Sequence, residues 1–161
     1  MITTYFFIII NITVFLLYSQ NAISTSHMCD KTLIANISQN FTHLEIAHIV
    51  LNLLAFYNLQ NLELHYGSYK YAQIILILVL FQSFITYIIN KNFNLTCSIG
   101  FSGVIFGLYM LDFFRLKDIN TTNIMFALFM IIQPSLYYRN VSLSGHLIGG
   151  LSGFFLSFLL A

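Results

Sequence analysis

The segment Ser144–Gly153 reads Ser-Gly-His-Leu-Ile-Gly-Gly-Leu-Ser-Gly and carries glycine at positions 145, 149 and 153. Residues four apart lie on one face of an α-helix, and small residues let two membrane helices approach closely. An earlier apolar segment carries a matching pair, Gly103 and Gly107. We therefore predict that these two segments are helices that pack against each other through their glycines.

This packing would bring together two polar side chains that are far apart in the chain. Ser102 lies within the tetrapeptide Gly100–Gly103, which reads Gly-Phe-Ser-Gly, and His146 directly follows Gly145. A serine hydroxyl becomes a nucleophile when a base within hydrogen-bond reach takes its proton, and a neutral imidazole can do this near neutral pH. Ser102 is therefore a candidate nucleophile, and His146 is a candidate general base.

Each of these residues also has a simpler interpretation. Small residues such as those around Ser102 are common wherever membrane helices pack, and His146 can instead form a hydrogen bond across a helix bundle. A carboxylate that would orient the histidine is not evident, because Asp112 lies ten residues along the same helix as Ser102, about 15 Å away. We therefore expect a Ser-His dyad and no triad, with the ring of Phe106 packing against His146.

A second polar pair lies upstream, in the segment His43–Asn52. His48 and Asn52 are four residues apart, so both lie on one helix face, and both side chains can donate hydrogen bonds. With the backbone N–H of Ser102 they would bind the oxyanion of an acyl-transfer reaction, which requires such donors. His43 lies off this face at the mouth of the helix, where a structural role is expected. No metal or other cofactor is expected, because no carboxylate or cysteine joins the histidines at ligand spacing.

The composition places the chain in a membrane. Of its 161 residues, 58% are hydrophobic and 7% are charged, whereas soluble domains carry about 25% charged residues. The net charge of +1, without a basic patch, indicates no nucleic-acid partner. Hydrogen bonding in lipid requires the apolar segments to be helices. We predict an all-α, multi-pass integral membrane bundle, a single domain over residues 1–161, with spans at about 5–19, 43–63, 71–89, 100–114, 121–137 and 142–161.

Six spans would place both termini on one side of the membrane and the long first loop on the other. Basic residues are divided three against three between the two sides, so the positive-inside rule does not orient the chain. Glycosylation acceptor motifs slightly favour an orientation that exposes the loop side to the glycosylating compartment. One such motif begins at Asn120, on the side of the termini. Four begin on the loop side, at Asn36, Asn40, Asn94 and Asn140.

The two cysteines, Cys29 and Cys97, fall in two loops of that same side. In an oxidising compartment a disulfide would tie these loops together. The presence of two cysteines does not by itself indicate that they pair, so free thiols are favoured over a disulfide.

Taken together, these motifs resemble the rhomboid intramembrane serine proteases. The resemblance covers the whole chain and rests on three motifs in the right order: His43, His48 and Asn52; then Gly100–Gly103; then His146, Gly149 and Gly153. It implies a six-helix bundle in which Ser102 attacks and His146 acts as general base and then general acid, with the glycines supporting the site. The implied partners are the lipid bilayer and single-pass membrane proteins, which such enzymes cut near the top of the transmembrane helix.

The resemblance also implies that a substrate enters sideways past the fifth predicted helix, which carries the only proline, Pro134. The chain departs from the family in its first loop, where the usual Trp-Arg pair is replaced by Ile34 and Ala35. The aromatic residue four positions after the serine is often Tyr in the family and is Phe106 here. The anchoring of the first loop is therefore left open by the sequence.

Two other functions would also suit a polar membrane bundle. One is a non-catalytic protein of the same fold that binds membrane clients for trafficking or degradation. The retained Ser102 and His146 argue against it. The other is a small channel or transporter, which gives no reason for a Ser-His pair backed by a His-Asn pair.

Overall fold

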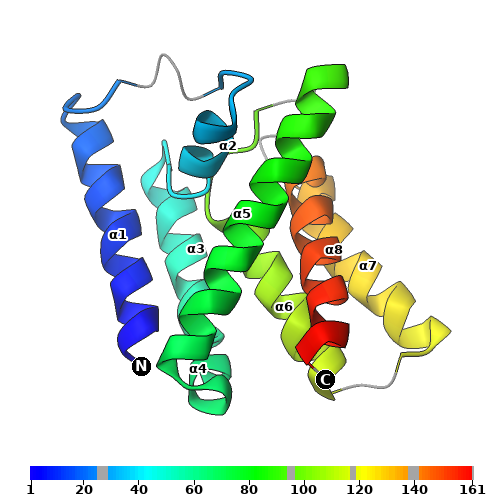
Figure 1. The fold of residues 1–161 in the computed structure, drawn as a ribbon. Helices are drawn as coiled ribbons and strands as arrows, with labels where there is room; N and C mark the ends of the chain where they lie inside the picture. The colour runs from blue at the N-terminus through cyan, green and yellow to red at the C-terminus, as the bar shows by residue number, and fades with distance from the viewer. Residues whose placement is uncertain (25–28, 94–96, 117–118, 138–141, 161) are drawn as a thin grey trace.

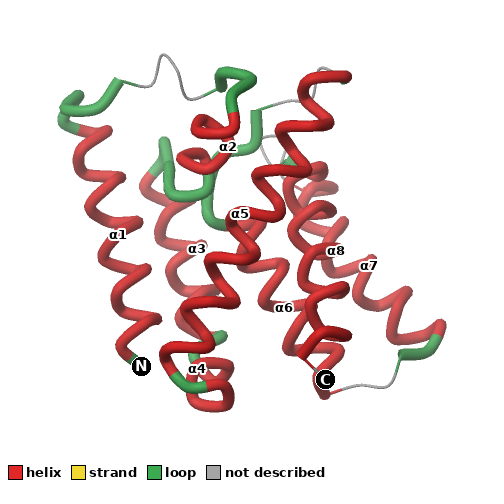
Figure 2. The backbone as a smooth tube through the Cα atoms, in the orientation of Figure 1, coloured by secondary structure: helices red, strands yellow, loops and turns green. Residues whose placement is uncertain are grey.

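The computed structural model describes residues 1–24, 29–93, 97–116, 119–137 and 142–160. These residues form eight α-helices and no strand (Figure 2). The helices are α1 (Ile2–Ser19), α2 (Leu33–Gln39), α3 (Ile46–Asn58), α4 (Asn61–Tyr66), α5 (Ser68–Asn92), α6 (Ser102–Leu116), α7 (Thr121–Tyr137) and α8 (Leu143–Leu160). The predicted all-helical fold is confirmed for this part of the chain.

Six long helices occupy the predicted apolar segments, but their boundaries differ. The segment predicted as one span over 43–63 is divided, since α3 ends at Asn58 and the short α4 follows it. Three helices, α1, α5 and α8, are long and apolar enough to cross a membrane. The helices α3 and α6, with 13 and 15 residues, are shorter than the ~20 residues of a full span. Length and hydropathy therefore support three of the six predicted spans.

The helices stand side by side, with both termini at one end of the bundle (Figure 1). The short helix α4 lies at this end, and α2, which forms part of the predicted first loop, lies at the opposite end. α6 contacts α3, α5, α7 and α8, so it occupies the middle of the bundle. Its apolar side chains Val104, Leu108 and Leu111 are fully buried. The start of α6, where Ser102 lies, is therefore surrounded by other helices.

Glu63 in α4 holds the first turn of α1. Its carboxylate accepts hydrogen bonds from the backbone N–H groups of Thr3 and Thr4 at 2.9 and 2.8 Å, and from the hydroxyls of Thr4 and Ser68 at 2.6 Å each. A carboxylate suits this place because the first N–H groups of a helix have no partner within it. α4 lies outside the candidate spans. Burial by itself raises the pKa of the Glu63 carboxyl, but the bonds from Ser68, Thr4 and Thr3 outweigh it and lower the pKa to about 2.

Acidification is expected to destabilise the protein through Glu63. The pKa of this carboxyl is about 2 in the folded state against its usual 4.5, so the unfolded chain takes up the proton first as the pH falls. The stabilisation is complete above about pH 4.5 and is lost as the pH falls towards about 2. Thermal unfolding in detergent micelles, measured from about pH 7 to about pH 3, should show this loss in the wild type. Glu63→Gln should be less stable near pH 7 and lack this part of the pH dependence, and parallel profiles would contradict the assignment.

Candidate active site

The helices α6 and α8 form the most extensive helix pair in the bundle, and they meet through glycine. A Cβ atom added at Gly149 would lie 2.6 Å from the carbonyl carbon of Gly103. One added at Gly153 would lie 2.5 Å from the carbonyl carbon of Gly107. Since side chains cannot approach a backbone this closely, only glycine allows this contact. The two glycine stripes therefore pack as their spacing predicted.

This packing places Ser102 and His146 on one cavity. Ser102 is the first residue of α6, and His146 lies in the first turn of α8. Both line a cavity of about 920 Å³, together with His48 and Asn52 of α3. No hydrogen bond joins Ser102 to His146 in the described part of the chain, and the Nδ1 atom of His146 is buried without a partner there. The structure thus gathers the four predicted residues but leaves the serine and the histidine unbonded.

The turn before α6 packs directly against α3. Gly100 has a φ of 114°, which favours glycine, and a Cβ atom there would lie 2.7 Å from the ring of His48 and 3.3 Å from the amide nitrogen of Asn52. The N–H of Gly100 donates to the carbonyl of Gln39 at 2.9 Å. A glycine at this position therefore lets the start of α6 lie against the predicted oxyanion-binding side chains.

Phe101, the second residue of the Gly-Phe-Ser-Gly turn, anchors the turn in the core. It is fully buried, and its ring centroid lies 5.1 Å from that of Phe56, 5.7 Å from Phe41 and 6.1 Å from Phe7. Sequence reasoning assigned no role to this residue. Its apolar character in an otherwise small-residue turn was the one signal that pointed to an anchor.

His43 connects Asn52 to the same turn. Its Nε2 atom lies 2.9 Å from Nδ2 of Asn52 and accepts the backbone N–H of Phe101 at 3.3 Å. Because a backbone N–H can only donate, Nε2 carries a lone pair and Asn52 also donates to it. Helical spacing had placed His43 away from Asn52. That expectation is wrong because α3 begins only at Ile46, so His43 lies in the preceding loop and reaches across.

Phe106 lies one turn into α6 and packs against the histidine of α8. Its ring centroid is 4.2 Å from that of His146. Asp112, further along α6, pairs with Arg115, with 2.7 Å between the carboxylate and the guanidinium. Within the described residues, no group of three or more His, Cys, Asp or Glu side chains is placed to hold a metal ion.

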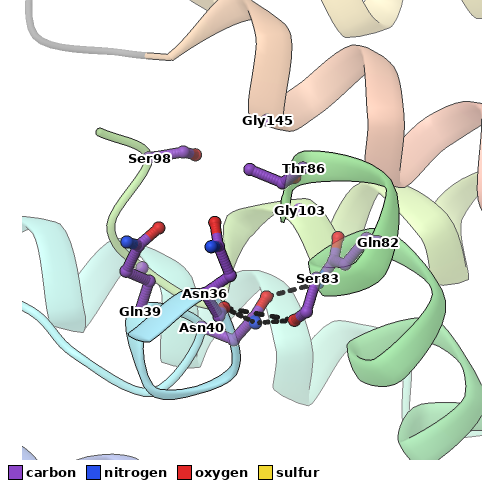
Figure 3. Close-up of a pocket in the computed structure, with 10 residues that line it drawn as sticks. Asn36, Gln39, Asn40, Gln82, Ser83, Thr86, Ser98, Gly103 and Gly145 are labelled. Carbon is purple, nitrogen blue, oxygen red and sulfur yellow. Dashed lines mark hydrogen bonds between the residues drawn. The ribbon is translucent and has the colours of Figure 1, made fainter. Parts of the chain in front are cut away.

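Amide side chains anchor the first loop, where the resemblance had implied a Trp-Arg pair (Figure 3). Asn40 donates to the hydroxyl of Ser83 at 2.9 Å, and Ser83 donates to the carbonyl of Asn36 at 3.1 Å. Gln82 donates to the side-chain oxygen of Asn40. These residues surround a polar cavity of about 20 Å³, which is too small for a peptide. Ile34, at one position of the missing pair, is 80% exposed, so the anchor lies elsewhere in α2.

The packing of these amide side chains buries two of the predicted glycosylation sites. Asn36 and Asn40 are 3% and 8% exposed, so the folded protein does not present their side chains. Asn94 and Asn140 lie outside the described residues, and Asn120 is exposed. The acceptor motifs therefore do not support an orientation as the sequence had suggested.

The cysteines are paired, and the expectation of free thiols is wrong. Cys29 and Cys97 form a disulfide, with their Cα atoms 5.5 Å apart. The pairing was hidden in the sequence because the two residues are 68 positions apart and meet only when α2 docks on α5. Cys97 also lines the large cavity, so the bridge ties the first loop to the segment that leads into the Ser102 turn.

Removing this disulfide is expected to destabilise the first loop. A bridge that closes a loop of this length stabilises a folded domain by about 2–4 kcal/mol. Cys29→Ser/Cys97→Ser should therefore unfold at a lower temperature in detergent micelles than the wild type. Mass measurement after maleimide treatment provides the control, because the wild type should take up two labels only after reduction. Labelling without reduction, or an unchanged unfolding temperature, would contradict the assignment.

Comparison with known proteins adds two findings. The family model for the Rhomboid domain matches residues 30–161. A protein of Acanthamoeba polyphaga mimivirus that is named as a rhomboid protein is 30% identical over 118 residues, which cover 72% of this chain and 68% of the viral protein. The range matched by the family model includes every residue that lines the large cavity.

Proposed function

This chain belongs to the rhomboid family, and we propose that it is an intramembrane serine endopeptidase that cleaves single-pass membrane proteins. One observation carries the proposal: Ser102 and His146, from two helices held together by glycine, line one cavity with His48 and Asn52. The cavity, at about 920 Å³, is large enough to receive an extended segment of a substrate.

In the proposed reaction the Ser102 hydroxyl attacks the carbonyl carbon of the scissile peptide bond while His146 takes its proton. The C–N bond then breaks, His146 returns the proton to the leaving amine, and an ester remains on Ser102. A water molecule that gives its proton to His146 attacks this ester, which releases the second product and restores the serine. Because Asp112 is paired with Arg115, Phe106 supports the imidazole in place of a carboxylate.

We assign the binding of the oxyanion to His48, Asn52 and the backbone N–H of Ser102. The N–H groups in the first turn of a helix have no partner within it and carry the positive end of its dipole. Ser102 begins α6, so its N–H has this character. His43 accepts one hydrogen of the Asn52 amide, which leaves the other for the substrate. His43 is thus a positioning residue and not a catalytic one.

The substrate would reach Ser102 from the lipid side, past α7. Met130, Gln133 and Pro134 of α7 line the cavity opposite the residues of α3. Proline inside a helix removes a backbone hydrogen bond, which weakens the helix at that point and suits a segment that has to move aside. The Cys29–Cys97 disulfide lies at the same end of the bundle, so this end would face an oxidising compartment.

Co-expression with a single-pass reporter tests the proposal. The wild type should release the two fragments of the reporter, and Ser102→Ala should not. Cleavage that persists in Ser102→Ala would overturn the assignment of the nucleophile. If neither form cleaves while both bind the reporter, the rival function is favoured, that of a non-catalytic rhomboid-fold protein that binds membrane clients.

Asn52→Ala is expected to slow cleavage without preventing substrate binding. Loss of one oxyanion donor raises the barrier by about 2–4 kcal/mol, which is roughly 30-fold to 1,000-fold in rate. Single-turnover cleavage of a purified reporter measures the rate, and crosslinking to the reporter measures binding. Gln60→Ala, in the link between α3 and α4, removes an amide away from the cavity and should cleave normally. An unchanged rate for Asn52→Ala would remove Asn52 from the site.

A further inference from the structure

A carboxylate lies at the edge of the proposed substrate cavity. Glu45, directly before α3, lines this cavity and is exposed. Glu45 is the extended N-cap residue of α3, three positions before His48 and seven before Asn52, and all three residues line the same cavity. The helical rise places Glu45 about 5 Å beyond His48 towards the end of the bundle that carries α2. Glu45 therefore lies at the end of α3 that carries the proposed oxyanion site.

The side chain of Glu45 does not cap α3, although capping is the usual structural role of a polar residue directly before a helix. A residue before a helix often caps it by accepting an N–H with its side chain, but Glu45 makes no such bond. No ion pair or hydrogen bond to its carboxylate is present in the described parts of the chain. Among the described residues that line the cavity, Glu45 is the one acidic side chain, and no Lys or Arg is present. A negative charge thus faces a cavity whose other lining residues carry no permanent charge, and it interacts electrostatically with the ring of His48.

We propose that Glu45 makes the site selective for substrates that carry Lys or Arg within about three residues of the scissile bond. This inference rests on the proposed protease function and adds a specificity to it. The scissile carbonyl would lie against His48 and Asn52, and an extended chain advances about 3.3 Å per residue. A basic side chain near the scissile bond can therefore reach a carboxylate one helical turn away. An acidic side chain at the same place would be repelled.

The test uses the purified full chain in phosphatidylcholine vesicles with a set of single-pass reporters. The reporters differ only in one residue, which is Lys, Gln or Glu, placed in turn at each of the three positions before and after the scissile bond. At the best position the wild type should cleave the Lys reporter about fivefold faster than the Gln reporter at low salt, as for an accessible ion pair. Raising NaCl from about 0.05 M to about 1 M should reduce this preference, since salt screens exposed charges.

Variants of Glu45 distinguish the effect of its charge on specificity from the effect of its side-chain shape. E45Q should cleave the Lys and Gln reporters at equal rates, E45D should keep the preference, and E45K should favour the Glu reporter. Asp30→Asn removes an acidic residue three positions before α2 that does not line the cavity, and it should keep the wild-type preference. Equal cleavage of Lys and Gln reporters by the wild type at every position would overturn the inference, as would a preference that survives in E45Q. If no reporter is cleaved in a Ser102-dependent manner, the proposed function itself fails and this inference fails with it.

Discussion

Replacing His146 with alanine is expected to reduce reporter cleavage by about 10³-fold or more while the helices remain folded. The physical reason is that Ser102 then has no base to take its proton, and general-base assistance contributes about 10²–10⁴-fold to such reactions. Two other polar groups are less suited to replace it, because Asp112 is engaged by Arg115 and His43 is engaged by Asn52 and Phe101. The rate of single-turnover cleavage in vesicles measures the loss.

A second measurement shows whether the histidine acts on the serine. Ser102 should react with a fluorophosphonate in the wild type, and His146→Ala should react far more slowly, because the same proton must leave the hydroxyl. His65→Ala is the matched control, since His65 is exposed in α4, near the end of the bundle that carries the termini. It should keep both activities. Wild-type cleavage by His146→Ala would show that another group is the base.

Replacing Gly149 with leucine is expected to separate α6 from α8 and to abolish both stability and activity. A Cβ atom at Gly149 would already lie 2.6 and 2.8 Å from backbone atoms of Gly103, and backbone cannot move aside as a flexible side chain can. Overpacking of a tight core costs about 1–3 kcal/mol and more where the backbone itself must shift. Because Gly103 follows Ser102, any shift that relieves the clash also moves the proposed nucleophile relative to His146.

The unfolding temperature in detergent micelles and reporter cleavage should therefore fall together in Gly149→Leu. Leu151→Phe adds volume to the same helix, where Leu151 is 47% exposed, and should change neither quantity. Gly149→Ala should show an intermediate loss, since it adds the Cβ atom alone. A stable and active Gly149→Leu would contradict the packing of the two glycine stripes.

The apolar pattern predicted the long helices well because a helix in lipid is determined by local composition and by hydrogen bonds within one segment. It failed at residues 43–63, where the apolar run continues but the helix does not. There the structure has a loop up to Glu45, then α3, then a separate α4 that carries Glu63. The buried Glu63 is stabilised by Thr3, Thr4 and Ser68, from two other segments, and no local pattern could indicate that arrangement.

The sequence by itself predicted the family of the protein and the residues of its proposed site. Glycine spacing predicted which two helices meet, and helix geometry then placed Ser102 near His146, because both steps depend only on periodicity along one segment. Only the tertiary structure decided how the site is held. His43 reaches Asn52 and Phe101 from a loop, Phe101 anchors the turn among three other rings, and Cys29 pairs with Cys97. Each of these contacts joins residues outside a common helix, so its existence depends on how loops close in space, which spacing along the chain does not encode.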